Sequence, residues 1–214
     1  MKYNTYLFDF DGTLVDSMPA YVSVMLRILD ENDIRYDNDI IKVITPLGYA
    51  GTAKYYIEHL GLDMPQDKIV KVMNQYAYNE YAHNIQAKTN VTETLKKLKE
   101  LGADLHVLTA SPHSVLDVCL KRLGIFDLFT NVWSCDDFGT TKADTEIYKI
   151  AAEKIGMPTD KILFLDDNYN ADKTARMAGM KVCGVYDLSS AEYADEIKRV
   201  SDHYINDFGE LLDF

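Results

Sequence analysis

The chain has 214 residues, of which 47% are hydrophobic and 26% are charged, so it is long enough for one folded core with a small insertion. The net charge of −12 argues against nucleic acid and anionic membrane surfaces as partners. Cys119, Cys135 and Cys183 are widely spaced and odd in number, which argues against a disulfide framework or a zinc site. Without an apolar leader or a membrane-length run, we expect a cytoplasmic protein, either a monomer or a small homo-oligomer.

The stretch 6–15 carries the strongest signal in the chain. Tyr6 to Phe8 form a short apolar run typical of a buried strand, and Asp9 and Asp11 follow directly, one residue apart. Gly12 then permits a sharp turn with a positive φ angle. Two carboxylates this close repel each other unless a cation or a proton offsets the repulsion. The pattern indicates either an ordinary acidic turn or a metal-assisted site with one nucleophilic and one acid–base carboxylate.

Residues 17–84 are expected to form an all-helical block without a convincing strand. Ser17 is a candidate helix cap, and Pro19 is tolerated in a first helical turn. Apolar residues at helical spacing and the Pro and Gly content of residues 46–51 predict helices separated by loops. The expected segments are a helix to about residue 31, a short apolar piece at 40–44, a loop at 46–51, and helices at 52–60 and 66–83.

The pattern changes from Val91 onward to strands that alternate with helices. Ser111 is expected to cap a helix that has Pro112 at its first position. This alternation predicts right-handed crossovers and a parallel sheet, so 1–16 and 85–214 should form a three-layer α/β core into which 17–84 is inserted. The predicted strands are 105–108, 132–134, 162–165 and 181–185, and the predicted helices are 91–101, 112–123, 144–155 and 171–178.

Polar residues occur where three of the predicted strands end. Asp9 and Asp11 follow the first strand, Thr109-Ala110-Ser111 follow another, and Asp166-Asp167 follow the apolar run 162–165. A polar strand end is common on its own. Ligands of parallel α/β sheets bind beyond the carboxyl ends of the strands, so these residues are expected to converge on one pocket.

Asp9-x-Asp11-Gly-Thr-Leu-Val15 resembles the first motif of the haloacid dehalogenase superfamily in its phosphatase form. Three further motifs of that family have matches in order. Thr109 fits the second, and Lys142 fits the third, although Ala143 replaces the usual proline. The segment 164–172 resembles the fourth. The insertion at 17–84 resembles the small α-helical cap of phosphoglycolate phosphatase and β-phosphoglucomutase relatives.

This resemblance implies a role for each candidate residue. Asp9 would be the nucleophile and Asp11 the acid–base, while Thr109, Ala110, Ser111 and Lys142 would bind the phosphoryl group. Mg²⁺ would be held by Asp9, Asp167 and the backbone carbonyl of Asp11, with Asp166 in an outer position or acting through water. Asp172 lies one position away from a further family acid, and its alternative role is to cap a helix. Lys54 is a candidate contact for an anionic leaving group, and Lys142 could instead be a solvated surface lysine.

The function that this resemblance implies is Mg²⁺-dependent hydrolysis of a small phosphorylated metabolite through an aspartyl-phosphate. One alternative is a sugar phosphomutase of the same family, and another is a regulatory module that retains the fold without catalysis. Dehalogenation fits poorly, because the dehalogenases of the family use no metal and lack the second aspartate. A module without catalysis would have no need to keep Asp9, Asp11, Thr109, Lys142 and Asp167 together.

Overall fold

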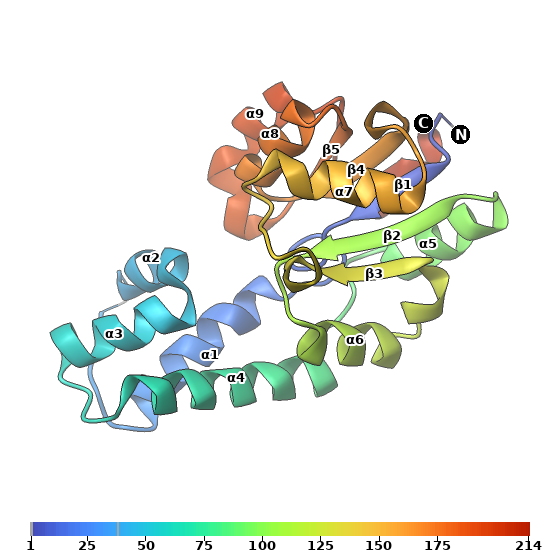
Figure 1. The fold of residues 1–214 in the computed structure, drawn as a ribbon. Helices are drawn as coiled ribbons and strands as arrows, with labels where there is room; N and C mark the ends of the chain where they lie inside the picture. Colours follow the sequence, from blue (N-terminus) through green and yellow to red (C-terminus); the bar gives the residue numbers. More distant parts are fainter. Residues whose placement is uncertain (1, 38) are drawn as a thin grey trace. The chain divides into compact units, whose positions relative to one another are not determined.

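The core is built on a six-stranded sheet in which every described pair of neighbouring strands is parallel (Figure 1). The structure is a computed structural model that describes residues 2–37 and 39–214, apart from the side chain of Pro46. The strand order is β3-β2-β1-β4-β5-β6. The predicted α/β fold class with a parallel sheet is therefore confirmed. The strands are β1 (Thr5–Phe8), β2 (Asp104–Thr109), β3 (Asn131–Ser134), β4 (Ile162–Asp166), β5 (Lys181–Val185) and β6 (His203–Ile205).

The strand register brings the polar segments to one edge of the sheet. Phe8 of β1 pairs with Val107 of β2 on one side and with Leu165 of β4 on the other. The backbone N–H of Asp9 continues this ladder by donating to the carbonyl of Leu165 at 2.8 Å. Because the strands run parallel and in step, the residues that follow β1, β2 and β4 emerge at the same carboxyl edge.

Helices cover both faces of this sheet, as right-handed crossovers require. In Figure 1, α7, α8 and α9 lie on one face, and α5 and α6 lie on the other. The central strands are consequently buried on both sides, which explains their continuous apolar sequences. The helices are α5 (Val91–Glu100), α6 (His113–Arg122), α7 (Thr145–Ile155), α8 (Tyr169–Met177) and α9 (Ala194–Val200).

Two local expectations for the core are wrong, and one strand was not predicted. Ser111 does not cap α6, because Pro112 is the N-cap residue and the Ser111 hydroxyl bonds elsewhere. Helix α8 begins at Tyr169 rather than at 171, because the side chain of Asn168 accepts from the N–H groups of Asn170 and Ala171. Strand β6 was not predicted. It has only three residues and pairs on one side with β5, so its sequence carries little alternation.

The second compact unit of the chain is entirely helical. Contacts divide the chain into residues 1–16 with 86–214 and residues 17–85. Inside the helical unit, the buried Tyr56 hydroxyl donates to the carbonyl of Met25, and the buried Thr52 hydroxyl donates to that of Ile44. Its helices are α1 (Met18–Asp30), α2 (Ile40–Ile44), α3 (Gly48–Leu60) and α4 (Gln66–His83). None of the helices in 2–37 and 39–214 combines the length and apolarity that a membrane span requires.

The expected loop at 46–51 is wrong for most of its length. A short 3-10 helix occupies Thr45–Leu47, and α3 begins directly at Gly48. Gly48 has a φ angle of +62°, so it redirects the chain between the two helices without the strain that a side chain would add. Pro and Gly here mark the junction of two helices rather than a loop.

Candidate active site

The turn after β1 holds Asp9 and Asp11 in different environments. Asp9 is buried, whereas Asp11 is partly exposed. Gly12 follows with a φ angle of +74°, and a Cβ atom at this position would lie only 2.7 Å from Oδ2 of Asp167. A side chain at residue 12 would therefore be strained and would also displace that carboxylate. The glycine is what lets the turn lie against the end of β4.

Lys142 lies between two of the candidate carboxylates. Its Nζ donates to Oδ1 of Asp9 at 2.6 Å and to Oδ2 of Asp166 at 2.7 Å. The side chain of Lys142 is 15% exposed, and those of Asp9 and Asp166 are almost completely buried. The interpretation of Lys142 as a solvated surface lysine is therefore wrong. The other oxygen of Asp166 accepts from the backbone N–H of Asn168, so both of its oxygens are engaged.

Burial shifts the pKa values of this cluster strongly. Burial, opposed by Lys142 and reinforced by Asp166 and Asp11, raises the pKa of Asp9 to about 7. Burial alone would lower the pKa of Lys142, but the charges of Asp166 and Asp9 outweigh burial and hold it well above its usual value. Burial and the charges of Asp166, Asp9 and Asp187 raise the pKa of Asp167 well above its usual value. The cluster holds more negative charge than its one ammonium can offset.

Asp9, Asp166 and Asp167 together fit a divalent cation. One carboxylate oxygen from each lies within 4.8 Å of the others, and all three residues are buried. Lys142 balances one of the three charges, which leaves two for a cation to neutralise. Hard oxygen ligands of this kind suit Mg²⁺. The hydroxyl of Thr13 donates to Oδ1 of Asp167 at 3.1 Å and so orients that carboxylate.

The loop after β2 contacts the second aspartate. The hydroxyl of Ser111 donates to Oδ2 of Asp11 at 2.5 Å. The backbone N–H of Ser111 donates to Oγ1 of the buried Thr109 at 3.1 Å, so this N–H does not face outward as an anion donor. Ala110 is exposed at the same edge of the sheet. Ser111, predicted as a helix cap, instead holds a carboxylate 100 residues away in sequence.

Asp172 is buried on α8 without a hydrogen-bond partner. Neither of its carboxylate oxygens has one among the described residues, and its side chain is not exposed. Burial, together with the charges of Asp166 and Asp167, raises its pKa well above the usual value. The alternative that Asp172 caps the helix is wrong, because Asn168 is the capping residue. Asp172 is absent from the group of three carboxylates close enough to share one ion.

Lys54 belongs to the helical unit and lies on the exposed side of α3. Its Nζ is 3.8 Å from Oε1 of Glu58, one helical turn away, and its side chain is 64% exposed. An ion pair this exposed adds little stability. The ammonium is therefore accessible, and its predicted contact with a leaving group stays a prediction.

Three polar contacts at the core site involve residues that the sequence did not single out. Thr13 was visible in the first motif, but nothing there indicated its bond to Asp167. Lys88 and Asp187 form a mostly buried ion pair at 3.0 Å, and Lys88 also binds the carbonyl of Gly12. The pair joins residues 99 positions apart, so no local pattern could have revealed it.

Comparison with known proteins agrees with this geometry. The sequence profile of the haloacid dehalogenase-like hydrolases matches residues 6–185. The chain belongs to this family. It is 26% identical over 182 residues to pyrophosphatase PpaX of Bacillus velezensis (strain DSM 23117 / BGSC 10A6 / LMG 26770 / FZB42), an alignment that covers 84% of this chain and 81% of the relative.

Several solved structures share the fold of this chain, including the following two. One is a predicted phosphoglycolate phosphatase from Haemophilus somnus 129pt, with a TM-score of 0.81, 22% identity, and coverage of 100% of this chain and 98% of the other. The second is a HAD family hydrolase from Deinococcus radiodurans R1 with bound phosphate and sodium, with a TM-score of 0.79, 20% identity, and coverage of 98% and 93%. At these identities the likeness shows the fold alone.

Proposed function

We propose that this hydrolase is a Mg²⁺-dependent phosphatase that acts on a small phosphomonoester through a phosphorylated Asp9. The observation that carries the proposal is the buried group of Asp9, Asp166 and Asp167, of which Asp9 and Asp166 bind the ammonium of Lys142. Asp9 is the member that belongs to the turn with Asp11, so one carboxylate can attack while its neighbour transfers protons. The family membership and the pyrophosphatase relative support the same class of reaction.

In the first step, a carboxylate oxygen of Asp9 attacks phosphorus, and the bond from phosphorus to the leaving oxygen breaks. Asp11, the partly exposed carboxyl of the turn, donates its proton to that oxygen. In the second step, Asp11 takes a proton from water as the water oxygen attacks phosphorus. The acyl phosphate bond then breaks, which releases phosphate and restores the carboxylate of Asp9.

The remaining residues orient the reactants. Lys142 binds Oδ1 of Asp9, which leaves Oδ2 as the attacking oxygen and adds positive charge beside the phosphoryl group. The hydroxyl of Thr109 can donate to a phosphoryl oxygen while its own oxygen accepts from Ser111. The hydroxyl of Ser111 sets the direction of the Asp11 carboxyl. Asp9, Asp167 and the carbonyl of Asp11 would hold Mg²⁺, which when bound neutralises charge between nucleophile and phosphate. Asp166, whose oxygens accept from Lys142 and Asn168, would act from an outer position or through water.

A panel of phosphate esters assayed with Mg²⁺ and with EDTA tests this proposal. Release of phosphate should stop in EDTA and return with Mg²⁺, and calorimetry should show Mg²⁺ binding that Asp167→Asn weakens at least about tenfold. Asp160→Asn, at an exposed carboxylate, is the matched control. The panel includes inorganic pyrophosphate, the named substrate class of the relative, and a hexose 1-phosphate, whose conversion to the 6-phosphate would favour a phosphomutase. Full activity in EDTA would contradict the mechanism.

A further inference from the structure

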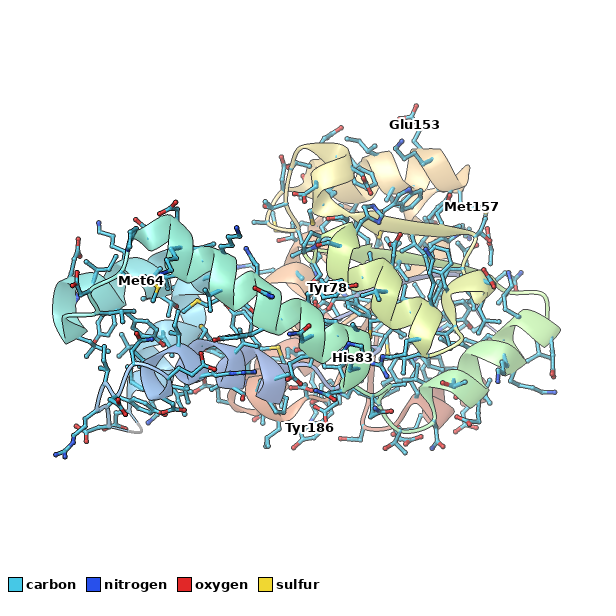
Figure 2. The ribbon with its side chains drawn as sticks, turned by 90° about the horizontal axis from the view of Figure 1, so that it is seen from below. Met64, Tyr78, His83, Glu153, Met157 and Tyr186 are labelled. Atoms are coloured by element: carbon cyan, nitrogen blue, oxygen red, sulfur yellow. The ribbon has the colours of Figure 1, made fainter. Side chains whose placement is uncertain are left out.

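The side chain of Lys88 joins three acceptors at the back of the turn that carries Asp11. Its Nζ donates to the carbonyl of Gly12 at 2.7 Å, to the carbonyl of Tyr186 at 2.5 Å and to Oδ2 of Asp187 at 3.0 Å. An ammonium has three N–H donors, so each has a partner here. The side chains of Lys88 and Asp187 are 18% and 7% exposed. Tyr186, labelled in Figure 2, follows β5 directly.

The backbone around Lys88 binds the same turn. The N–H of Lys88 donates to the carbonyl of Leu14, and the N–H of Asp16 donates to the carbonyl of Gln86. Val15 and Ala87 form an antiparallel bridge between these hydrogen bonds. The segment 86–88 is thus paired to 14–16, and the side chain of Lys88 extends this pairing to Gly12. The turn is held by main chain on one side and by the ammonium on the other.

Gly12 is the point through which this attachment reaches the site. Its carbonyl binds Lys88, its N–H donates to the carbonyl of Val15, and its Cα faces the carboxylate of Asp167. Asp11 directly precedes it, and the N–H of Gly12 lies in the same peptide plane as the carbonyl of Asp11, so the two hydrogen bonds of Gly12 restrict the backbone from which the side chain of Asp11 projects. A shift of about 1 Å in a catalytic group can cost about 10²-fold in rate.

We propose that Lys88, paired with Asp187, is a positioning residue that holds the turn 11–13 so that Asp11 meets the leaving oxygen. Asp187 is itself fixed, because its Oδ1 accepts from the N–H and the hydroxyl of Ser189 at the start of the segment after β5. The pair therefore links the turn to the segment that follows β5, which is part of the folded core. The role of Asp11 at the leaving oxygen rests on the proposed phosphatase function, whereas the attachment of the turn by Lys88 does not.

Two variants separate positioning from folding. Lys88→Met removes the ammonium at similar length but leaves the buried Asp187 unpaired, which destabilises the fold. Lys88→Met with Asp187→Asn removes both charges and keeps an acceptor for Ser189, so it should recover most of the lost stability. Lys97→Met is the matched control, because Lys97 also lies 3.0 Å from a carboxylate, that of Glu100, but in an exposed pair on α5.

The first readout is hydrogen–deuterium exchange of peptides that span residues 10–16. Exchange should rise in both Lys88 variants and remain at the wild-type level in Lys97→Met. The second is the ratio of kcat for an alkyl phosphate to kcat for p-nitrophenyl phosphate, whose leaving group needs little acid assistance. We expect kcat for the alkyl phosphate to fall about 10–100-fold, and that for p-nitrophenyl phosphate less than about threefold. A loss of folded enzyme would lower both substrates equally.

A cavity beside Lys88 could admit a small amine that replaces the missing ammonium in a variant. It has a volume of about 270 Å³ and is lined in part by Lys88, Tyr186 and Asp187. Ethylammonium should restore alkyl phosphate turnover in Lys88→Ala, where the truncated side chain leaves room for it, and have no effect in Lys88→Ala with Asp187→Asn. Unchanged exchange in 10–16 would overturn the inference whether or not the protein hydrolyses phosphate esters. Raised exchange with an unchanged substrate ratio would overturn the positioning of Asp11, and an inactive wild type would overturn the proposed function alone.

Discussion

Two lysines, one in each unit of the chain, occupy opposite environments. Lys142 in the core is 15% exposed and binds two carboxylates at 2.6 and 2.7 Å. Lys54 in the helical unit is 64% exposed and lies 3.8 Å from the carboxylate of Glu58. In the core, burial strengthens the attraction between Lys142 and its carboxylates, and the hydrogen bonds fix the direction of these side chains. Around Lys54, water weakens the attraction to Glu58 and leaves the ammonium free to move. The proposed mechanism assigns rate to the core, and we predict that substrate choice depends on the exposed helical unit.

The strongest test of this comparison is Asp9→Asn, which removes the proposed nucleophile and keeps its shape. Turnover of every phosphate ester should be lost, because an amide does not attack phosphorus. Trapping of fluoroberyllate, a phosphate mimic that binds the carboxylate, should be lost as well. The measurement is steady-state phosphate release together with ¹⁹F NMR of the trapped complex. Residual activity within about tenfold of the wild type would place the nucleophile elsewhere.

The second test, Asp11→Asn, keeps the nucleophile and removes the proton donor. Alkyl phosphates should lose about 10²–10⁴-fold in kcat, since the leaving oxygen then departs as an alkoxide. With p-nitrophenyl phosphate the first step should persist, and stopped-flow should show a burst as phospho-enzyme accumulates. The variant also removes a charged partner of Ser111, so circular dichroism is needed to check the fold. Equal loss of both steps in a folded variant would contradict the division of roles.

The third test concerns Asp172, a buried carboxyl of the core without a hydrogen-bond partner among the described residues. Its pKa is raised, so the folded state binds a proton more tightly than the unfolded state. Stability from this group is complete below the unfolded pKa and is lost as pH rises through the folded pKa. Thermal unfolding in EDTA should therefore show Asp172→Asn to be more stable than the wild type at about pH 8, and similar at about pH 4.

The control for this variant is Asp160→Asn, which changes an exposed carboxylate. Because Asp172 is outside the three-carboxylate group, Mg²⁺ binding to Asp172→Asn should change less than about threefold. A loss as large as that of Asp167→Asn would make Asp172 a ligand. The same pH difference in the Asp160 control would show that overall charge, rather than burial, controls stability.

The sequence predicted best those features that depend on residues adjacent in the chain, such as a strand or the polar residues that follow it. Strand β5 (Lys181–Val185) was predicted with its observed limits, because a buried parallel strand is a continuous apolar run. The candidates Asp9, Asp166 and Asp167 follow such runs, and the shared carboxyl edge brings them together. Ser111 was misread because its position before a proline fits a helix cap equally well. Its bond to Asp11 depends on tertiary structure.

Contacts between distant segments could not be read in this way. The bond from Lys88 to Asp187 links the segment before α5 to the end of β5, and neither residue lies in a motif. The burial of Asp172 likewise depends on how α8 packs against β4 and β5. Helical periodicity places a residue on a face of a helix, but it does not show whether a carboxylate there finds a partner. Such residues become visible only when the sheet is assembled.

The smallest expected effect is that of Lys54→Ala, which tests whether the helical unit selects substrates. In the proposed mechanism the core residues contact the phosphoryl group and the metal, and Asp11 reaches only the leaving oxygen, so the core does not contact the rest of the leaving group. An anionic leaving group bound by the ammonium of Lys54 should lose on the order of 1–3 kcal/mol in the variant, the range of a charge-assisted hydrogen bond. Turnover of p-nitrophenyl phosphate should fall less than about tenfold, since that leaving group offers only a nitro group and a ring.

The matched variant is Glu58→Ala, which removes the partner of Lys54 on α3 and keeps the ammonium. An exposed pair at 3.8 Å contributes little to stability, so neither variant should change the unfolding temperature appreciably. If Lys54 selects substrates, its replacement changes relative kcat/KM across the panel, whereas Glu58→Ala leaves the ranking intact or favours anionic leaving groups. An equal fall for all substrates would assign Lys54 to catalysis or folding. No change at all would make it a solvated surface residue, and selection by leaving-group charge would then have to come from another part of the chain.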